Sequence, residues 1–280
     1  MKPALPFAIG IALLAASALP AAAQSSDNTW SGFYIGGQIG GSEPSSDRGS
    51  RILFDTNLDG SFGDTVRTGT GADAFSPGFC DGAANARTPG AGCREDKGGA
   101  EAGLRAGFDW QSGNLVYGMV LEYTQNDARD SVSAFSTTPA LYTMTRDLDS
   151  TLALRARLGL AFGENSDWLG YATAGAVRGR FENSFNTSNG ANAFPQSGET
   201  DANGYQAGVG IERKILENFS VGLEYLYTRL EDDEFRVRAA PGTAPATNPF
   251  LLVNPAGTDF RRSDEDFELN SLRLTGTFRF

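Results

Sequence analysis

The sequence has no histidine, only two cysteines and very few lysines among its 280 residues. Without histidine, the chain cannot support Ser-His-Asp catalysis or histidine-based zinc sites. It also lacks any apolar run of the roughly 20 residues that a membrane-spanning helix needs. These absences exclude a helical membrane protein and the histidine-dependent hydrolases.

Positive charge is scarce as well. The chain carries 23 Lys and Arg residues against 34 Asp and Glu residues, for a net charge of −11, and arginine supplies most of the positive charge. An acidic chain of this kind argues against nucleic acid as a partner. The 35 glycines and 19 phenylalanines suit tightly packed strands and turns better than helices.

The first residues read as a removable export signal. Lys2 gives a short positive start, an apolar run follows from Phe7 to Leu19, and three alanines offer a cleavage site before Gln24. This is the layout of a secretory signal peptide, predicted here for residues 1–23. The mature chain, residues 24–280, is then expected to meet an oxidising compartment.

Hydrophobic residues alternate with small or charged ones in eight stretches, each long enough to cross a membrane as a tilted strand. The stretches are residues 32–42, 100–111, 115–125, 151–163, 168–182, 204–214, 218–230 and 268–280. A soluble β-sandwich also alternates, so alternation alone does not decide between the two. The identity of the polar face and the lengths of the connections do.

The polar face carries arginines and carboxylates in the middle of the strands. Arginine offers a planar fork that satisfies several carboxylates in a crowded space. We therefore predict a network of ion pairs inside a closed barrel, and an interior filled by side chains. Its members are Glu101, Arg105, Asp109, Glu122, Arg155, Arg157, Arg178, Arg180, Glu212, Glu224, Arg273 and Arg279.

The connections alternate strictly between short and long. Three short turns lie near residues 112–114, 164–167 and 215–217, and four long loops cover about 43–99, 126–150, 183–203 and 231–267. Short turns on one side and long loops on the other are typical of bacterial outer-membrane barrels. The fold predicted is all-β, an eight-stranded antiparallel transmembrane β-barrel with long extracellular loops. Aromatic residues including Trp30, Tyr171 and Phe181 are expected at its two membrane interfaces.

The first long loop holds two candidate features. Cys80 and Cys93 are expected to form a disulfide in an exported protein, and the alternative is two free thiols. Asp55, Asn57, Asp59 and Gly60 spell the opening of a calcium loop, to which Asp64 could add an oxygen. Val66 stands where such a loop needs its bidentate glutamate, and an ordinary turn accounts for the same residues.

The two ends of the mature chain resemble a known family. The stretch from Trp30 to Gly37, with its Trp-x-Gly-x-Tyr-x-Gly pattern, and the final Arg279-Phe280 resemble the outer-membrane β-barrel domain family of small porin-like and opacity-like surface proteins of Gram-negative bacteria. The resemblance implies location in the outer membrane. It also implies that Phe280 is the signal read by the barrel-assembly machinery.

Three functions remain open from the sequence. The first is a structural protein whose surface loops meet the exterior and its lipopolysaccharide, for which acidic clusters at 231–234 and 264–266 and the adjacent Arg261 and Arg262 are candidate contacts. The second is a narrow, porin-like channel for small solutes. The third is an enzyme, which the missing histidine weakens. We expect a non-enzymatic protein without a cofactor, calcium aside, and the ligand of the surface loops is not specified by the sequence.

Overall fold

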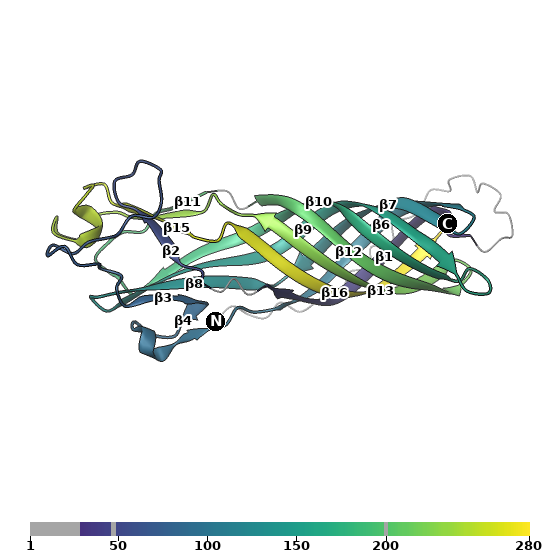
Figure 1. Ribbon diagram of the computed structural model, residues 1–280, viewed down its shortest axis with the longest axis horizontal. Coiled ribbons are helices and arrows are strands. Elements are labelled where there is room, and N and C mark those ends of the chain that lie inside the picture. The colour runs from purple at the N-terminus through teal and green to yellow at the C-terminus, as the bar shows by residue number, and fades with distance from the viewer. Residues whose placement is uncertain (1–28, 46–48, 199–200) are drawn as a thin grey trace.

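The computed structural model describes residues 29–45, 49–198 and 201–280. The predicted signal peptide lies outside these residues. Eight long strands close into an antiparallel barrel, in which each strand pairs with its neighbour along the chain and the last pairs with the first (Figure 1). They are β1 (Gly32–Pro44), β6 (Gly99–Ser112), β7 (Leu115–Asn126), β9 (Ala140–Phe162), β10 (Trp168–Thr187), β12 (Asp201–Leu216), β13 (Phe219–Glu231) and β16 (Asp266–Arg279).

The closure of the barrel is required by the surrounding bilayer. Inside a bilayer no water is present to satisfy an open strand edge, so a membrane-spanning sheet must pair its first and last strands. Here β1 pairs with β16 from Tyr34 opposite Arg279 to Pro44 opposite Leu269. No helix in the described part of the chain has the length and hydropathy needed to cross a membrane.

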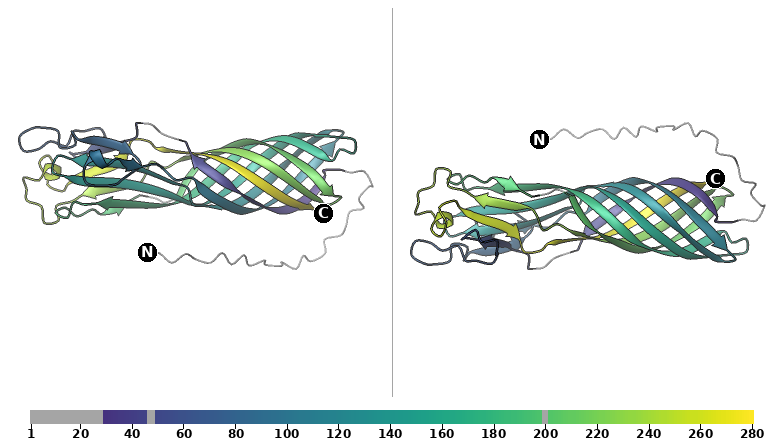
Figure 2. Two further views of the ribbon diagram at one scale, coloured as in Figure 1. Left: turned by 90° about the horizontal axis from the view of Figure 1, so that it is seen from below. Right: turned by 90° about the horizontal axis from the view of Figure 1, so that it is seen from above.

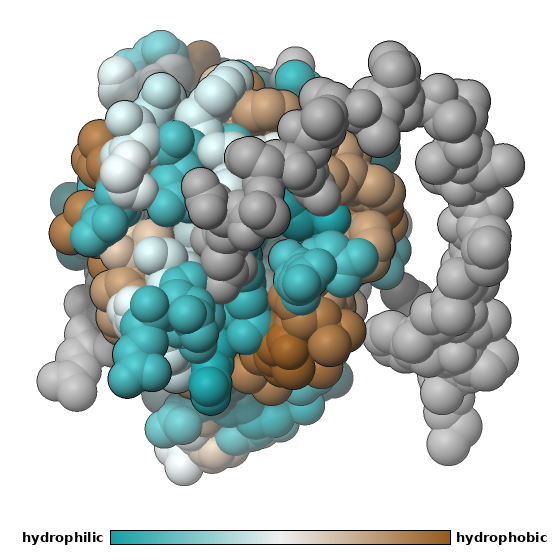
Figure 3. Space-filling model, turned by 90° about the vertical axis from the view of Figure 1, so that its right-hand side faces the viewer, coloured by the Kyte–Doolittle hydropathy of each residue, from teal (hydrophilic) through white to brown (hydrophobic). Residues whose placement is uncertain are grey.

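The predicted alternation holds on seven of the eight strands, where large apolar side chains point outward. Leu104, Leu158 and Leu274 are each more than half exposed on the outer wall, where a membrane-spanning barrel carries its apolar band. Figure 3 views the short-turn end, where hydrophilic residues cover much of the end and hydrophobic ones lie toward the flanks. The exception is β10, described below.

The four long connections are not irregular loops but fold into a β-rich extension, here called the head. It contains β2 (Ile52–Asp55), β3 (Gly78–Asp81), β4 (Ala83–Ala84), β5 (Cys93–Arg94), β8 (Arg129–Ser136), β11 (Gln196–Ser197), β14 (Arg236–Ala239) and β15 (Thr258–Arg262), with short 3₁₀ turns η1 (Pro89–Ala91) and η2 (Pro249–Leu251). Strands β9 and β10 run from the barrel into the head, which makes the molecule an elongated rod (Figure 2).

The head has a hydrophobic core of its own. Phe75, Tyr142, Phe250 and Phe260 are buried there and pack in mutual ring contacts. Aromatic side chains bury more apolar area than any others, so such a cluster stabilises a compact unit. The surface region is therefore a folded structure held on the end of the barrel.

Candidate functional site in the barrel interior

Two arginines and two glutamates meet at the centre of the barrel. Arg105 of β6 donates to Glu122 of β7 and, at 2.9 Å, to Glu224 of β13. Arg155 of β9 contacts Glu122 and lies 3.1 Å from the Glu224 carboxylate. All four side chains are at most 1% exposed. Each carboxylate thus serves two arginines from different strands.

Further pairs lie on both sides of this centre. Arg157 donates to Glu212 and to the Tyr34 hydroxyl, both at 2.9 Å, and its guanidinium stacks 4.1 Å from the centroid of the Tyr171 ring. Toward the long loops, Arg273 binds Glu101 through two nitrogens. The Tyr171 hydroxyl donates to Glu224 at 2.8 Å, which links the layers to one another.

A third pair closes the seam between the first and last strands. Arg279 of β16 donates to Asp109 of β6 at 3.0 Å and to the backbone oxygens of Trp30 and Gly32. Its guanidinium also lies 4.9 Å from the centroid of the Tyr34 ring. One side chain thus ties the last strand to β1, to β6 and to the residues that precede β1.

The interior charges balance. Five arginines face inward (Arg105, Arg155, Arg157, Arg273 and Arg279) against five carboxylates (Glu101, Asp109, Glu122, Glu212 and Glu224), all of them buried. Burying a charge is tolerable only when it is paired and hydrogen-bonded. The structure therefore brings together ten of the twelve residues predicted for this network.

Arg178 and Arg180 do not belong to the network, and their predicted placement is wrong. Both are exposed on the outer surface, where Arg178 pairs with Asp201 at 2.9 Å. The cause is the orientation of β10. Its neighbour β9 sets Arg155 opposite Gly175, which fixes the odd-numbered residues of this part of β10 inside and the even-numbered ones outside.

Apolar side chains take the interior positions of β10 and seal the lumen toward the long loops. Val177 and Phe181 pack there with Leu148, Leu230, Phe267 and Leu269, all of them buried. The rings of Phe181 and Phe267 meet edge to face, 5.1 Å apart. This cluster, the outer seal, was missed because apolar residues were assigned to the lipid side, and Phe181 is not an interface residue.

A second apolar cluster, the inner seal, closes the short-turn side. It consists of Trp30, Val116, Ala161, Leu169 and Tyr171. Trp30 is completely buried, its backbone amide donates to Gln111, and its ring nitrogen donates to the Ser166 oxygen at 2.9 Å. Trp30 and Tyr171 were expected at the membrane interface, but they lie inside. The register of β10 against β9 is the signal that could have located Tyr171, whereas Trp30 precedes β1 and has no strand partner.

Above the outer seal lies a buried ionic cluster of the head. Asp130 accepts from Arg146 and Arg262, each at 2.7 Å. Burial raises the pKa of Asp130, but the two guanidiniums outweigh burial and hold it below its ordinary value of 3.8. Arg146 also stacks 5.2 Å from the centroid of the Phe267 ring. A cavity of about 560 Å³ opens at this level, with Asp130, Arg146 and Phe267 in its lining.

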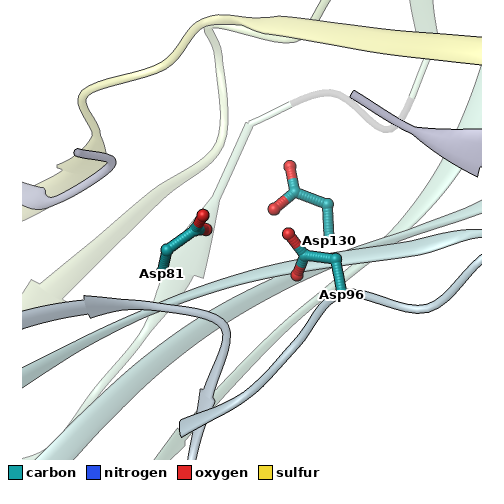
Figure 4. A group of neighbouring side chains, drawn as sticks. All are labelled: Asp81, Asp96 and Asp130. Carbon is teal, nitrogen blue, oxygen red and sulfur yellow. The ribbon is translucent and has the colours of Figure 1, made fainter. Parts of the chain in front are cut away.

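Three aspartates of the head turn their carboxylates toward one another: Asp81, Asp96 and Asp130 (Figure 4). One carboxylate oxygen of each residue lies within 4.8 Å of one from each of the other two. Asp130 already holds two arginines, and Asp96 accepts from the Ser131 amide at 2.8 Å. The group therefore forms part of the packing of the head.

The candidate calcium residues act as turn-forming side chains. Asp55 accepts backbone amides of Leu58, Asp59 and Gly60, and Asp64 accepts from the amide and hydroxyl of Thr56. The Asn57 amide donates to Asp59 at 2.8 Å. The buried carboxylate of Asp55 thus accepts hydrogen bonds from the backbone, as expected for an Asx-type turn. Calcium binding here stays a prediction.

Two further predictions concern the head and the end of the chain. Cys80 of β3 and Cys93 of β5 form a disulfide, which links two short strands of the head. Phe280 directly follows β16; its ring is exposed and lies 5.1 Å from that of Phe278. This position leaves the ring accessible, and its role as an assembly signal stays a prediction.

Comparison with known proteins points in one direction. A family model described as an outer membrane protein β-barrel domain matches residues 10–241. The 31 kDa outer-membrane immunogenic proteins of Brucella melitensis and Brucella suis are each 30% identical over 134 residues, which is 48% of this chain and 55% of theirs. The chain thus spans about half the length of these relatives.

A solved structure shares the fold. The outer membrane protein OprG from Pseudomonas aeruginosa superposes with a TM-score of 0.51, covering 89% of this chain and 97% of that one. Its sequence is 13% identical, so the likeness concerns the fold alone.

Proposed function

Because the chain belongs to the outer membrane protein β-barrel domain family, we propose that it is a non-conducting barrel of the outer membrane, whose role is to hold a folded head on the cell surface. The proposal assigns it no catalytic activity. A narrow porin-like channel is the alternative.

One observation carries the proposal: the lumen is filled along its length. Five buried arginine–carboxylate pairs occupy the middle, and an apolar seal lies on either side of them. Hydrophobic constrictions exclude water and ions even where a gap remains. Ions would have to cross two apolar layers and break buried pairs in between, which opposes conduction.

The construction of the head supports a surface role. Its own hydrophobic core and its disulfide make it rigid, and rigid surfaces bind partners at a lower entropic cost than mobile loops. The Brucella relatives are named immunogenic, which for those proteins fits exposure at the surface.

Planar bilayer recording tests the proposal. We expect the purified, heat-modifiable barrel to give no steady unit conductance, and the variant Phe181→Ala/Phe267→Ala to stay silent because the arginine layers remain. Leu104→Ala, on the lipid side, is the matched control. Steady unit conductance of the wild type that changes with Arg155→Gln would instead establish the channel.

A further inference from the structure

The four-stranded sheet of the head, in the order β11-β14-β15-β2, has two unlike faces. Its inner face supplies Ile52, Phe54, Val237 and Phe260 to the head core. Its outer face carries four arginines. Arg236 and Arg238 lie on β14, Arg261 lies on β15, and Arg51 directly precedes β2. In a chain of net charge −11, this face concentrates positive charge.

Phe62 organises two of these arginines. The guanidinium carbons of Arg236 and Arg261 each lie 4.8 Å from the centroid of its ring. The two residues come from adjacent strands, directly beside the paired Val237 and Phe260. Stacking on a common ring fixes both guanidiniums, so less side-chain entropy remains to be lost when a ligand binds.

The counter-charges on this face are incomplete. Arg238 is held by Asp259 and Arg261 contacts Glu265. Arg236 has no carboxylate within 4.0 Å in the described parts of the chain, and its Nη1 atom has no hydrogen-bond partner there. Four arginines against Asp55, Asp259 and Glu265 leave one positive charge, and the like charges of Arg236 and Arg261 on neighbouring strands oppose one another. An anion bridging Arg236 and Arg261 would relieve this repulsion.

The position of the sheet indicates where such an anion comes from. Strand β15 ends at Arg262, and the barrel strand β16 begins at Asp266, so this end of the sheet adjoins the long-loop end of the barrel (Figure 1). The outer leaflet around an outer-membrane barrel consists of lipopolysaccharide, whose sugars carry phosphate groups. Arginine recognises phosphate through two parallel hydrogen bonds.

We propose that Arg236 and Arg261, positioned by Phe62, bind phosphate groups on the sugars of surrounding lipopolysaccharide. Of the two arginines predicted to contact lipopolysaccharide, only Arg261 is in a position to do so. Arg262 is 6% exposed and points inward to Asp130. The proposal is independent of whether the barrel conducts.

Binding of rough-type lipopolysaccharide to the full mature chain in detergent tests the site, with the same lipopolysaccharide after chemical dephosphorylation as the comparison. Arg236→Gln/Arg261→Gln is expected to weaken binding of the phosphorylated form about tenfold and to leave binding of the dephosphorylated form unchanged. Phe62→Leu, which keeps both charges, is expected to weaken binding of the phosphorylated form about threefold.

The matched control is Arg87→Gln/Arg94→Gln, which removes two exposed arginines of the head away from this sheet. It should stay within about twofold of the wild type, because distant exposed charges are screened by salt. Heat modifiability shows that each variant folds. Equal losses in the site and control variants, indifference to the phosphates, or arginine-dependent binding of a heparin oligosaccharide without binding of lipopolysaccharide would each overturn the proposal.

Discussion

At the scale of single residues, the interior depends on partners that cannot be replaced by water. Arg155 is completely buried and contacts carboxylates from two strands, Glu122 and Glu224. Removing one member of a buried ion pair costs about 3–5 kcal/mol, because the remaining charge keeps its desolvation penalty without its compensation. Surface pairs contribute about 0–1 kcal/mol.

Arg155→Gln is therefore expected to lower the free energy of unfolding by about 3 kcal/mol. Its control is Arg178→Gln, on the outer surface, which should change it by less than about 1 kcal/mol. Urea unfolding in lipid vesicles, followed by tryptophan fluorescence, measures both. Equal effects of the two substitutions would contradict the orientation of β10 described above.

At the scale of the strand, the sequence predicts most of the barrel because lipid and lumen impose a period of two. Seven strands follow the rule that large apolar residues face outward. Strand β10 departs from it because its interior positions build the seals, while Ala172, Ala174 and Ala176 face outward. Alanine occurs on either face of a barrel strand, so these residues do not indicate which face of β10 points to lipid. For this reason, Arg178 and Arg180 are predicted on the wrong face from the sequence alone.

The strands of the head could not be predicted in the same way. Several of their short segments pair with partners far along the chain, such as β2 with β15 and β3 with β8, and no local period specifies those pairings. The cysteine pair and the turn at Asp55 were identified because their signals are local. Phe62 and Arg236 were not identified, since only the fold brings them together.

Gly210 on β12 leaves room for the Tyr171 side chain of the neighbouring strand. A Cβ atom at Gly210 would lie 2.4 Å from the Tyr171 ring, which stacks on Arg157 and donates to Glu224. Gly210→Val should displace this ring and destabilise the barrel by about 1–3 kcal/mol, an overpacking cost. Ala174→Val, on the outer side of β10, is the control. Unfolding in urea compares the two, and an unchanged Gly210→Val variant would mean that the ring has room to move.

At the scale of the whole molecule, two rigid parts meet at the Asp130 cluster. Asp130 belongs to β8 of the head, and Arg146 stacks on Phe267 of the outer seal. Charge at this junction therefore couples the head to the barrel. The coupling depends on an ionised carboxylate between two buried guanidiniums.

The junction is expected to weaken in acid. The pKa of Asp130 is held below 3.8 in the folded protein, so the unfolded chain takes up a proton first as the pH falls. The stabilisation is thus fully present above about pH 4 and is lost as the pH drops through the lower, folded-state pKa. This loss of stability is measured by amide hydrogen exchange of β8 between pH 6 and pH 2.5, corrected for intrinsic rates. Asp130→Asn should abolish the dependence, and persistence in that variant would assign it to another group.

The three tryptophans of the chain report on separate surroundings. Trp110 is 46% exposed on the outer wall, and Trp168 lies beside Phe162 and Arg213 at a short turn. Trp30 alone is enclosed in the lumen. A quencher attached to acyl chains would therefore dim the outer indoles and spare the enclosed one. Fluorescence during insertion into a bilayer can then distinguish two events. One is the burial of Trp30 in the lumen, and the other is the contact of the outer barrel surface with lipid.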